Sequence, residues 1–398
     1  MKIIVLGAGV IGMTTAYALA RAGHNVSVVD RASEPASQTS HANGAQLAYS
    51  YAEPFACPAT LKKLPGYFMG KDAGLSMRPS LSPAFYRWGL AFVKNCTAGM
   101  ETKNLHAMLT LAAKSQATTQ ALAREIDINI IDCGKLILTR TQEDLESYGK
   151  LEAVKTEYGL PVQMLGKGAC LDLEPALTGW QGEFFGGLYA RGDGVLDPAL
   201  FCKALQKAAS DNYGVRFEFG REILDLRTKA GRVKTVHTDQ GDMDCDAAII
   251  CLGNEANTFL KPLNDHQNIY PLQGYSLTFP LGKTPPRTSI TDPKNKMVFA
   301  NLGDKIRIAG LADVNLPSSK IKARGQHLLS TAKRLWPDIA DYSAPPPLWV
   351  ASRPTTPSSL PIVRASKTKG LYYNIGHGSL GLTLAAGCAQ KITELIAD

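Results

Sequence analysis

Apolar residues follow strand and helix patterns from the start of the chain. The run Lys2 to Leu6 predicts a buried strand, a glycine turn follows it, and a helix is expected to about Ala22. Gly23 stands where a helix C′ residue belongs, and the apolar run Asn25 to Asp30 predicts a second strand. This succession predicts a βαβ unit.

Similar patterns predict the later elements. Helical spacing and capping residues predict helices over 105–126, 141–158, 197–211 and 380–397. Alternating or buried apolar runs predict strands over 215–226, 232–237, 247–253, 270–279, 296–300, 305–311 and 371–375, with a hairpin turn at 303–304. Elements of the βαβ type thus occur at both ends of the chain and around 195–253. We therefore expect a discontinuous nucleotide-binding domain interleaved with a second, mixed domain.

Composition narrows the class of protein. With 398 residues, 45% hydrophobic and 20% charged, the chain is neither disordered, nor collagen-like, nor a small disulfide scaffold. Its net charge of +8 lies between Lys283 and Arg334, where eleven basic residues face three acidic ones. The sequence therefore predicts one basic face and argues against binding to nucleic acid.

The cysteines and the first apolar run indicate a compartment. The eight cysteines are scattered, without a C-x-x-C pair or a cluster with histidines, so we expect reduced thiols and no metal site. The run Ile3 to Ala20 has no charge, but its three glycines disfavour a spanning helix or a signal segment. A cytoplasmic protein is expected.

The first glycine turn has the pattern Gly-x-Gly-x-x-Gly. It follows a predicted strand and precedes a predicted helix. An acidic residue, Asp30, comes 18 positions after Gly12, so the full dinucleotide fingerprint is present. Gly7 permits the tight turn, Gly9 lets the backbone approach a pyrophosphate, and Gly12 lets helix and strand pack closely. Asp30 would accept hydrogen bonds from ribose hydroxyls. The fingerprint leaves NAD and FAD both open, and a glycine turn that binds nothing is the alternative.

The C-terminal part carries more specific motifs. The stretches Arg353-Pro-Thr-Thr-Pro, Leu360-Pro-Ile-Val and Tyr373 to Gly387 resemble the closing signature of the D-amino-acid-oxidase superfamily of FAD enzymes. Within it, the chain is most similar to the bacterial D-amino-acid dehydrogenases of the small-subunit type, over the stretches 39–46, 51–54, 270–280 and 306–313. The chain departs from the family pattern at Gln273, where a lysine is common, and at Leu382, where a tryptophan is common. These departures concern preference for the substrate side chain.

The resemblance implies an α/β fold. A Rossmann-like FAD-binding domain, of the glutathione-reductase βαβ type, would be interleaved with a mixed α+β substrate domain that contains an antiparallel sheet. The FAD-binding domain would comprise residues 1–48, 190–262 and 346–398, and the substrate-binding domain residues 49–189 and 263–345.

The resemblance also assigns roles around the substrate. Arg353 would grip the amino-acid carboxylate with two parallel hydrogen bonds, although a structural arginine is the alternative. His377 would be a catalytic base or, as we favour, a loop or flavin contact. Tyr51 and Tyr275 would line the substrate pocket, and core packing explains them equally well.

FAD contacts are implied along the two glycine turns, the loop after the second strand, and isolated positions elsewhere. They are Gly7, Gly9, Val10, Ile11, Gly12, Asp30, Arg31, Ser40, Ala42, Asn43, Gly44, Gln46, Leu47, Ile223, Gly253, Gly376, Gly378, Leu380, Gly381 and Thr383. The glycines of the second turn would bring main-chain N–H groups to the flavin edge where negative charge collects on reduction.

The implied reaction is oxidative deamination of D-amino acids. A hydride would pass from Cα to flavin N5, the imino acid would hydrolyse to a 2-oxo acid and ammonia, and the electrons would go to a quinone or a dye. Alternatives are an amine or imino-acid oxidase of the same fold, of the glycine, sarcosine or proline type, and a flavoprotein subunit of a larger complex. The basic region could attach the protein peripherally to an anionic membrane, or be a solvated face. No pattern fixes the oligomeric state.

Overall fold

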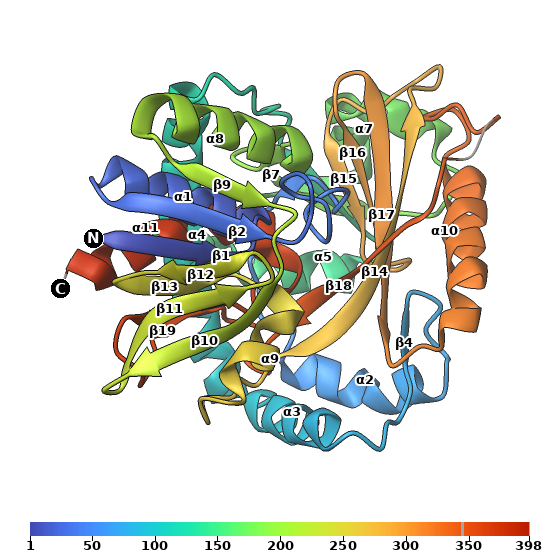
Figure 1. The fold of residues 1–398 in the computed structure, drawn as a ribbon. Coiled ribbons are helices and arrows are strands. Elements are labelled where there is room, and N and C mark those ends of the chain that lie inside the picture. The colour runs from blue at the N-terminus through green and yellow to red at the C-terminus, as the bar shows by residue number, and fades with distance from the viewer. Residues whose placement is uncertain (344–345, 398) are drawn as a thin grey trace.

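Two large sheets of different character stand side by side in the computed structural model, which describes residues 1–343 and 346–397 (Figure 1). One sheet is mostly parallel and holds the N-terminal strand, and the other is mostly antiparallel. The predicted α/β fold with an additional antiparallel sheet is therefore confirmed. The predicted domain ends at residues 345 and 398 lie outside the described residues.

The mostly parallel sheet has six strands within the described chain. Their order is β19 (Ile362–Ala365), β20 (Leu371–Ile375), β13 (Ala247–Ile250), β1 (Lys2–Leu6), β2 (Asn25–Asp30) and β9 (Arg216–Phe219). Strand β1 lies at its centre, where Ile3 is in register with Val26 on one side and Ala247 on the other. Its residues 3–6 are fully buried, because both faces of the sheet are covered, and this explains the unbroken apolar run.

Four helices cover one face of this sheet. They are α1 (Val10–Arg21), α4 (Ala98–Glu125), α8 (Pro198–Tyr213) and α11 (Gly381–Ala397). Asp197 caps α8 by accepting hydrogen bonds from the amides of Ala199 and Leu200, and Gly214 ends the helix in the left-handed conformation. The predicted start and end of this helix are thus confirmed.

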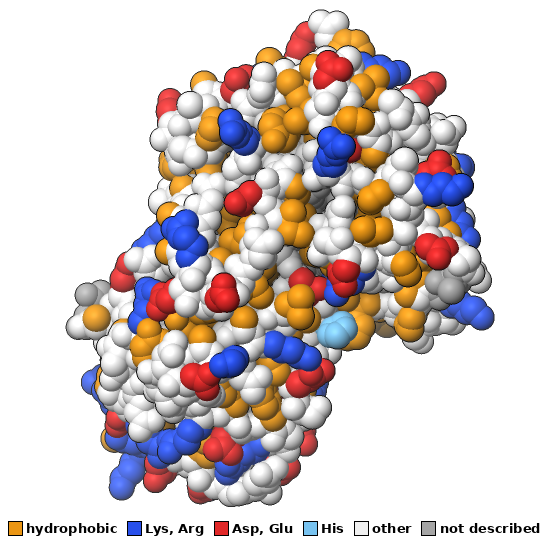
Figure 2. Space-filling view, turned by 90° about the horizontal axis from the view of Figure 1, so that it is seen from above, with side chains coloured by type: hydrophobic (Ala, Val, Ile, Leu, Met, Phe, Trp, Pro, Cys, Tyr) orange, Lys and Arg blue, Asp and Glu red, His pale blue; other side chains and the backbone are white. Residues whose placement is uncertain are grey.

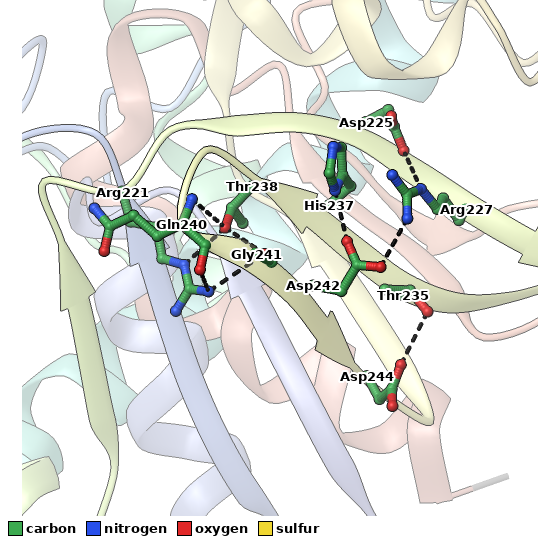
Figure 3. Close-up of polar contacts among 10 residues, drawn as sticks. All are labelled: Arg221, Asp225, Arg227, Thr235, His237, Thr238, Gln240, Gly241, Asp242 and Asp244. Carbon is green, nitrogen blue, oxygen red and sulfur yellow. Dashed lines mark hydrogen bonds and ion pairs between the residues drawn. The ribbon is translucent and has the colours of Figure 1, made fainter.

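A three-stranded antiparallel meander covers the other face, formed by β10 (Ile223–Lys229), β11 (Arg232–Thr238) and β12 (Gly241–Asp244). Cross-strand polar contacts join its strands (Figure 3). Asp242 accepts from Arg227 Nη1 at 2.7 Å and contacts His237 Nδ1 at 2.5 Å, and Asp244 accepts from Thr235 Oγ1 at 3.0 Å. These contacts hold the meander together at its exposed side and so position Ile223, at the start of β10.

The second sheet has nine strands within the described residues. Eight follow the order β18 (Trp349–Thr355), β14 (Tyr270–Pro280), β17 (Lys305–Val314), β16 (Met297–Asn301), β15 (Ser289–Asp292), β5 (Lys135–Thr139), β7 (Gly186–Ala190) and β6 (Gln163–Gly166). Strand β4 (Leu75–Met77) pairs with β17. The predicted β16–β17 hairpin is confirmed as an antiparallel pair. Helix α10 (Ile321–Leu335) contributes Leu328 and Leu335 to the core of this sheet.

Shorter elements complete the chain. They are β3 (Gln46–Leu47), β8 (Gly194–Val195), α2 (Pro58–Phe68), α3 (Pro83–Asn95), α5 (Gln142–Gly149), α6 (Glu152–Glu157), α7 (Lys167–Leu173) and α9 (Ala256–Leu260). Among the residues that are described, no helix is both long enough and apolar enough to cross a bilayer.

The structure corrects three predicted elements. The single helix predicted over 141–158 is two helices, because α5 ends at Gly149 and α6 begins at Glu152. The strand predicted over 215–226 is interrupted at Gly220, which has a φ of 65°. The helix predicted from residue 105 begins at Ala98, where the side chain of Thr97 accepts from the amide of Met100.

The division into domains stays a prediction. Helix α4 lies in the segment assigned to the substrate domain, yet Met108 and Ala112 belong to the core that also holds α1 and α11. Strand β18 lies in the segment assigned to the FAD-binding domain, yet it pairs with β14 of the second sheet. Chain position alone therefore does not assign these two elements.

The single basic face expected between residues 283 and 334 stays a prediction, because seven of the eleven basic residues are exposed and the other four are not. Arg307 is only 4% exposed and donates to the carbonyl of Asn43 at 2.9 Å. Arg324 pairs with Asp313 at 2.8 Å, and Lys296 faces an internal cavity. Figure 2 shows basic and acidic side chains interspersed on the face that it presents. The local excess of lysine and arginine is therefore divided between the surface and the interior.

Candidate active site

A cavity of about 1360 Å³ lies between the two sheets. Its lining comes from the β1–α1 turn and the ends of β13 and β20 on one side, and from β14, β16, β17 and β18 on the other. Sites for single small molecules measure roughly 300–1,000 Å³. The cavity therefore has room for a dinucleotide and a further small ligand.

The first glycine turn forms one end of the cavity. Gly7 has a φ of 101°, and a Cβ there would lie 2.9 Å from the carbonyl oxygen of Cys251. A Cβ on Gly12 would lie 1.8 Å from the carbonyl oxygen of Gly7, so only glycine lets α1 start against β1. The N-terminus of α1 consequently faces the cavity, and the amides of a first helical turn lack acceptors within their own helix.

Asp30 and Ser40 hold this turn in place. The Asp30 carboxylate accepts from the amide of Ala8 at 2.7 Å and from the amide of Ala32 at 2.9 Å. Ser40 Oγ accepts from the amide of Val10 at 3.0 Å. Both residues also line the cavity, which leaves Asp30 able to accept hydroxyl hydrogen bonds as well.

Two glycine-containing loops meet farther along the cavity. One follows β2 and reaches β3, and the other contains Gly376 and Gly378, which have φ of 79° and 56°. The amide of Ala48 donates to Thr383 Oγ1 at 3.1 Å, which joins the first loop to α11. The Arg307 guanidinium holds the same loop from the side of the second sheet through the carbonyl of Asn43. The loops that the sequence places far apart thus form one wall.

His377 lies in this wall and is only 3% exposed. Burial lowers the pKa of its imidazole to about 3, so the ring is neutral at physiological pH and is a weak base. Its Nε2 is a buried polar atom without a partner among the described residues. The same holds for three further atoms on the cavity lining: Asn254 Oδ1, Trp349 Nε1 and Asn374 Oδ1. Buried polar groups are normally paired, so these atoms fit a large polar ligand in the cavity.

Arg353 is at the other end, on β18, with its guanidinium lying over the backbone of Gly274. A Cβ on Gly274 would lie 2.3 Å from Arg353 Nη2. Nη1 donates to the carbonyl of Leu311 at 3.2 Å, and burial lowers the pKa of the group, although a guanidinium stays charged. Among the described residues, no carboxylate lies within 4.0 Å of this guanidinium. A half-buried cation without a carboxylate partner among the described residues thus faces the cavity.

The carboxylate nearest in the fold is committed elsewhere. Asp313 accepts from Arg324 Nε at 2.8 Å and from Arg324 Nη2 at 2.9 Å. Tyr275 donates to Gln273 Oε1 at 3.1 Å, and burial raises the pKa of its phenol, with Asp313 as a further cause. Tyr275 and Gln273 line the cavity beside Arg353, so the pocket at this end combines one free cation with neutral polar groups.

Tyr51 and Lys135 form a third part of the wall. The Lys135 ammonium lies 4.7 Å from the centre of the Tyr51 ring and donates to Gln46 Oε1 at 2.9 Å. Lys135 is 2% exposed, and burial lowers its pKa to about 8. Below that pH a second cation therefore faces the cavity.

The structure brings nearly all predicted site residues together. Every residue named as catalytic or as an FAD contact lines the cavity except Gly12, which packs α1 against β1, and Leu47, which is buried in the core. Sequence reasoning missed Lys135, Glu53 and Asn254. Of these, Lys135 carries a signal, because it opens the otherwise apolar strand Lys-Leu-Ile-Leu-Thr.

Known proteins are similar to this chain over its full length. The chain matches the family described as DAO, FAD dependent oxidoreductase, over residues 2–395. The chain belongs to this family. A D-amino acid dehydrogenase of Rhizobium johnstonii is 36% identical over all of this chain and 96% of its own length, and D-amino acid dehydrogenase 2 of Ralstonia nicotianae is 35% identical over the same shares.

Solved structures of DAO-like architecture support the fold. The glycine oxidase of Geobacillus kaustophilus has a TM-score of 0.74 at 22% identity, covering 99% of this chain and 94% of its own. The L-proline dehydrogenase of P. horikoshii has a TM-score of 0.73 at 16% identity, covering 99% and 92%. The DAO family is FAD dependent, and the cavity with its unpartnered polar atoms fits that cofactor.

Proposed function

We propose that this DAO-family protein is an FAD-dependent D-amino-acid dehydrogenase. The observation that carries the proposal is the Arg353 guanidinium, which is half-buried, faces the cavity and has no carboxylate within ion-pair distance among the described residues. A buried charge is costly unless it is paired, so the site is built for an anionic group of the substrate. A planar carboxylate fits a guanidinium fork. Full-length relatives named D-amino acid dehydrogenase favour the D-amino acids among carboxylates.

The residues of this chain would bind the cofactor and orient the substrate. Gly7, Gly9 and the start of α1 would hold the pyrophosphate, Asp30 the ribose, and the loops around Asn43 and Gly378 the flavin. When bound, FAD supplies a two-electron acceptor for the hydride that leaves Cα. Arg353 would fix the carboxylate and thereby the face of Cα that is presented.

Neither His377 nor Tyr275 is suited to accept a proton from the substrate. The pKa of His377, at about 3, makes it a poor acceptor at neutral pH, and Tyr275 has a raised pKa and stays protonated. We infer that the substrate ammonium loses its proton to solvent before binding, so that the amine is neutral when the hydride leaves Cα. Loss of hydride then gives an imino acid, which water hydrolyses to a 2-oxo acid and ammonia.

The electron acceptor and the location complete the proposal. We propose that a respiratory quinone, or a dye in its place, takes the electrons, and that the protein attaches peripherally to the membrane that holds the quinone. The unequal distribution of exposed apolar and basic side chains, described below, supports the attachment.

An anaerobic titration tests the substrate class. Purified yellow protein is mixed with a panel of D- and L-amino acids while flavin absorbance is followed, and bleaching by D-amino acids is expected. Arg353→Leu is expected to raise the apparent KM by orders of magnitude while the spectrum of bound flavin stays normal. Loss of flavin from this variant, or bleaching only by glycine, sarcosine or L-proline, contradicts the proposal. Stoichiometric peroxide in air would identify an oxidase instead.

A further inference from the structure

Exposed apolar side chains gather on one part of the molecule. Of the eleven large hydrophobic side chains that are exposed among the described residues, six lie between residues 68 and 93: Phe68, Met69, Leu81, Tyr86, Leu90 and Val93. Leu81 is 95% exposed and Leu90 is 67% exposed. The others are spread singly over the chain. Isolated exposed hydrophobics need no explanation, but a cluster marks an interaction site.

Helix α3 shows that the cluster is a face. Tyr86, Leu90 and Val93 follow the spacing i, i+4, i+7 and therefore form one stripe along the outer side of the helix. Trp88 and Phe92, on the opposite side, are buried against α2 and β4 in one apolar core. The helix is thus apolar on two sides, and only one side is packed against the protein.

Exposed basic side chains occur in the same segment as these apolar residues. Between residues 58 and 97 the chain has six basic residues, all exposed: Lys62, Lys63, Lys71, Arg78, Arg87 and Lys94. The single acidic residue in that range is Asp72, whose carboxylate accepts from the amides of Gly74 and Leu75. Arg87 and Lys94 flank the apolar stripe on α3. We call this set of six apolar and six basic residues the α2–α3 surface; α2 and α3 run along the lower edge in Figure 1.

We propose that the α2–α3 surface docks on an anionic lipid bilayer. Apolar side chains would enter the interface between headgroups and acyl chains while the lysines and arginines meet the anionic headgroups, which is how an interfacial helix binds. An anionic bilayer accounts both for the exposed apolar side chains and for the excess of positive charge in this segment. This proposal identifies the surface through which the protein would attach to the membrane. It rests on the proposed function only in that a membrane quinone is taken as the electron acceptor.

The position of the surface relative to the cavity agrees with a membrane-bound acceptor. On the inner side of α3, Trp88 lines a small apolar pocket and donates from Nε1 to the carbonyl of Thr355 at 2.8 Å. Phe55, Leu75 and Leu272 line both this pocket and the main cavity. The inner side of α3, opposite the proposed docking surface, is therefore connected to the main cavity through shared apolar residues.

Vesicle flotation of the holoenzyme tests the docking. Wild-type protein should float with vesicles of phosphatidylcholine and phosphatidylglycerol at low salt, and less so at high salt or with phosphatidylcholine alone. The variant Tyr86→Ser/Leu90→Ser/Val93→Ser should bind on the order of a hundredfold more weakly. Because each charge near the surface contributes roughly a fivefold factor, Lys62→Gln/Lys63→Gln/Arg87→Gln should lose a comparable amount.

Matched variants elsewhere serve as controls. Phe185→Ser/Leu200→Ser removes exposed apolar side chains outside the surface, and Lys320→Gln/Lys322→Gln/Lys333→Gln removes exposed charges of the 283–334 region. Both should bind like wild type. The proposal is overturned if wild type does not float with anionic vesicles, if these control variants lose binding instead, or if the α2–α3 variants change only self-association in sedimentation velocity.

Turnover separates docking from the proposed function. With a D-amino acid, the α2–α3 variants should keep the wild-type rate with a soluble dye and lose the rate with a quinone embedded in anionic vesicles. An unchanged quinone rate would overturn the link between docking and acceptor. Flotation without any turnover of D-amino acids would remove the proposed function and leave the docking surface intact.

Discussion

Gly274→Ala should damage the substrate site through Arg353 without touching the cofactor. The new Cβ would lie 2.3 Å from Nη2 and 2.6 Å from Cζ of Arg353, and ordinary contact begins at 3.4 Å. The guanidinium must therefore move by about 1 Å, and a displacement of that size in a positioning group typically costs on the order of a hundredfold in rate. The φ of Gly274 is not in the left-handed region, so alanine adds no backbone strain.

The assay is dye-linked oxidation of D-amino acids, with flavin absorbance as a measure of cofactor retention. We expect kcat/KM to fall on the order of a hundredfold with the flavin spectrum unchanged. Gly166→Ala is the matched control, because its Cβ would meet no atom within 4 Å. If alanine acts only through the guanidinium, it should add nothing in an Arg353→Leu background. Additive losses, or wild-type activity of Gly274→Ala, would refute this reasoning.

Three further predictions concern buried titratable groups. The Lys135 ammonium has a pKa near 8 when folded and 10.5 when unfolded, so the unfolded state binds one more proton than the folded state between these values. Urea unfolding should therefore show wild-type stability rising with pH relative to Lys135→Met in this range, by up to about 3 kcal/mol, while other buried groups affect both proteins alike. Glu53→Gln should cost about 3 kcal/mol of unfolding free energy, because it strands the buried Lys155 ammonium 2.6 Å away, and adding Lys155→Met should restore most of it. His377→Gln should leave the inflections of the pH profile of kcat/KM above pH 5 unmoved, since the imidazole titrates near pH 3; a vanished inflection would make it a base after all.

The elements that sequence patterns predicted best are those whose reason is local. Asp197 and Gly214 bound α8 as expected, because an N-cap carboxylate and a left-handed glycine act within one turn. The break at Gly220, between β9 and β10, also has a local cause. It was not predicted, because the alternation of apolar and polar residues continues across it. The glycine turn of Gly7 to Gly12 was predicted for the same reason, because three nearby glycines are enough to allow the close backbone contacts of the turn.

Features that depend on tertiary packing could not be predicted in this way. Arg307 belongs to a basic run, yet cross-strand pairing turns it inward to Asn43. Lys135 faces the cavity because β5 runs beside β15, where its partner in register is Ser289, 154 residues away in the sequence. The apolar stripe on α3 looks like an ordinary helix pattern until the buried side is known, since Trp88 rather than Leu90 packs inward.

The central place of β1 in its sheet has a consequence for biosynthesis. Strand β2 leaves the ribosome soon after β1, but the partner on the other side, β13, becomes available only after residue 250 has been made. The second wall of the cofactor cavity, at the start of α11, is made more than a hundred residues after β13. One edge of β1 thus stays unpaired until β13 has been made, and an unpaired strand edge can associate with other chains during synthesis. The cofactor cavity cannot close before both walls exist.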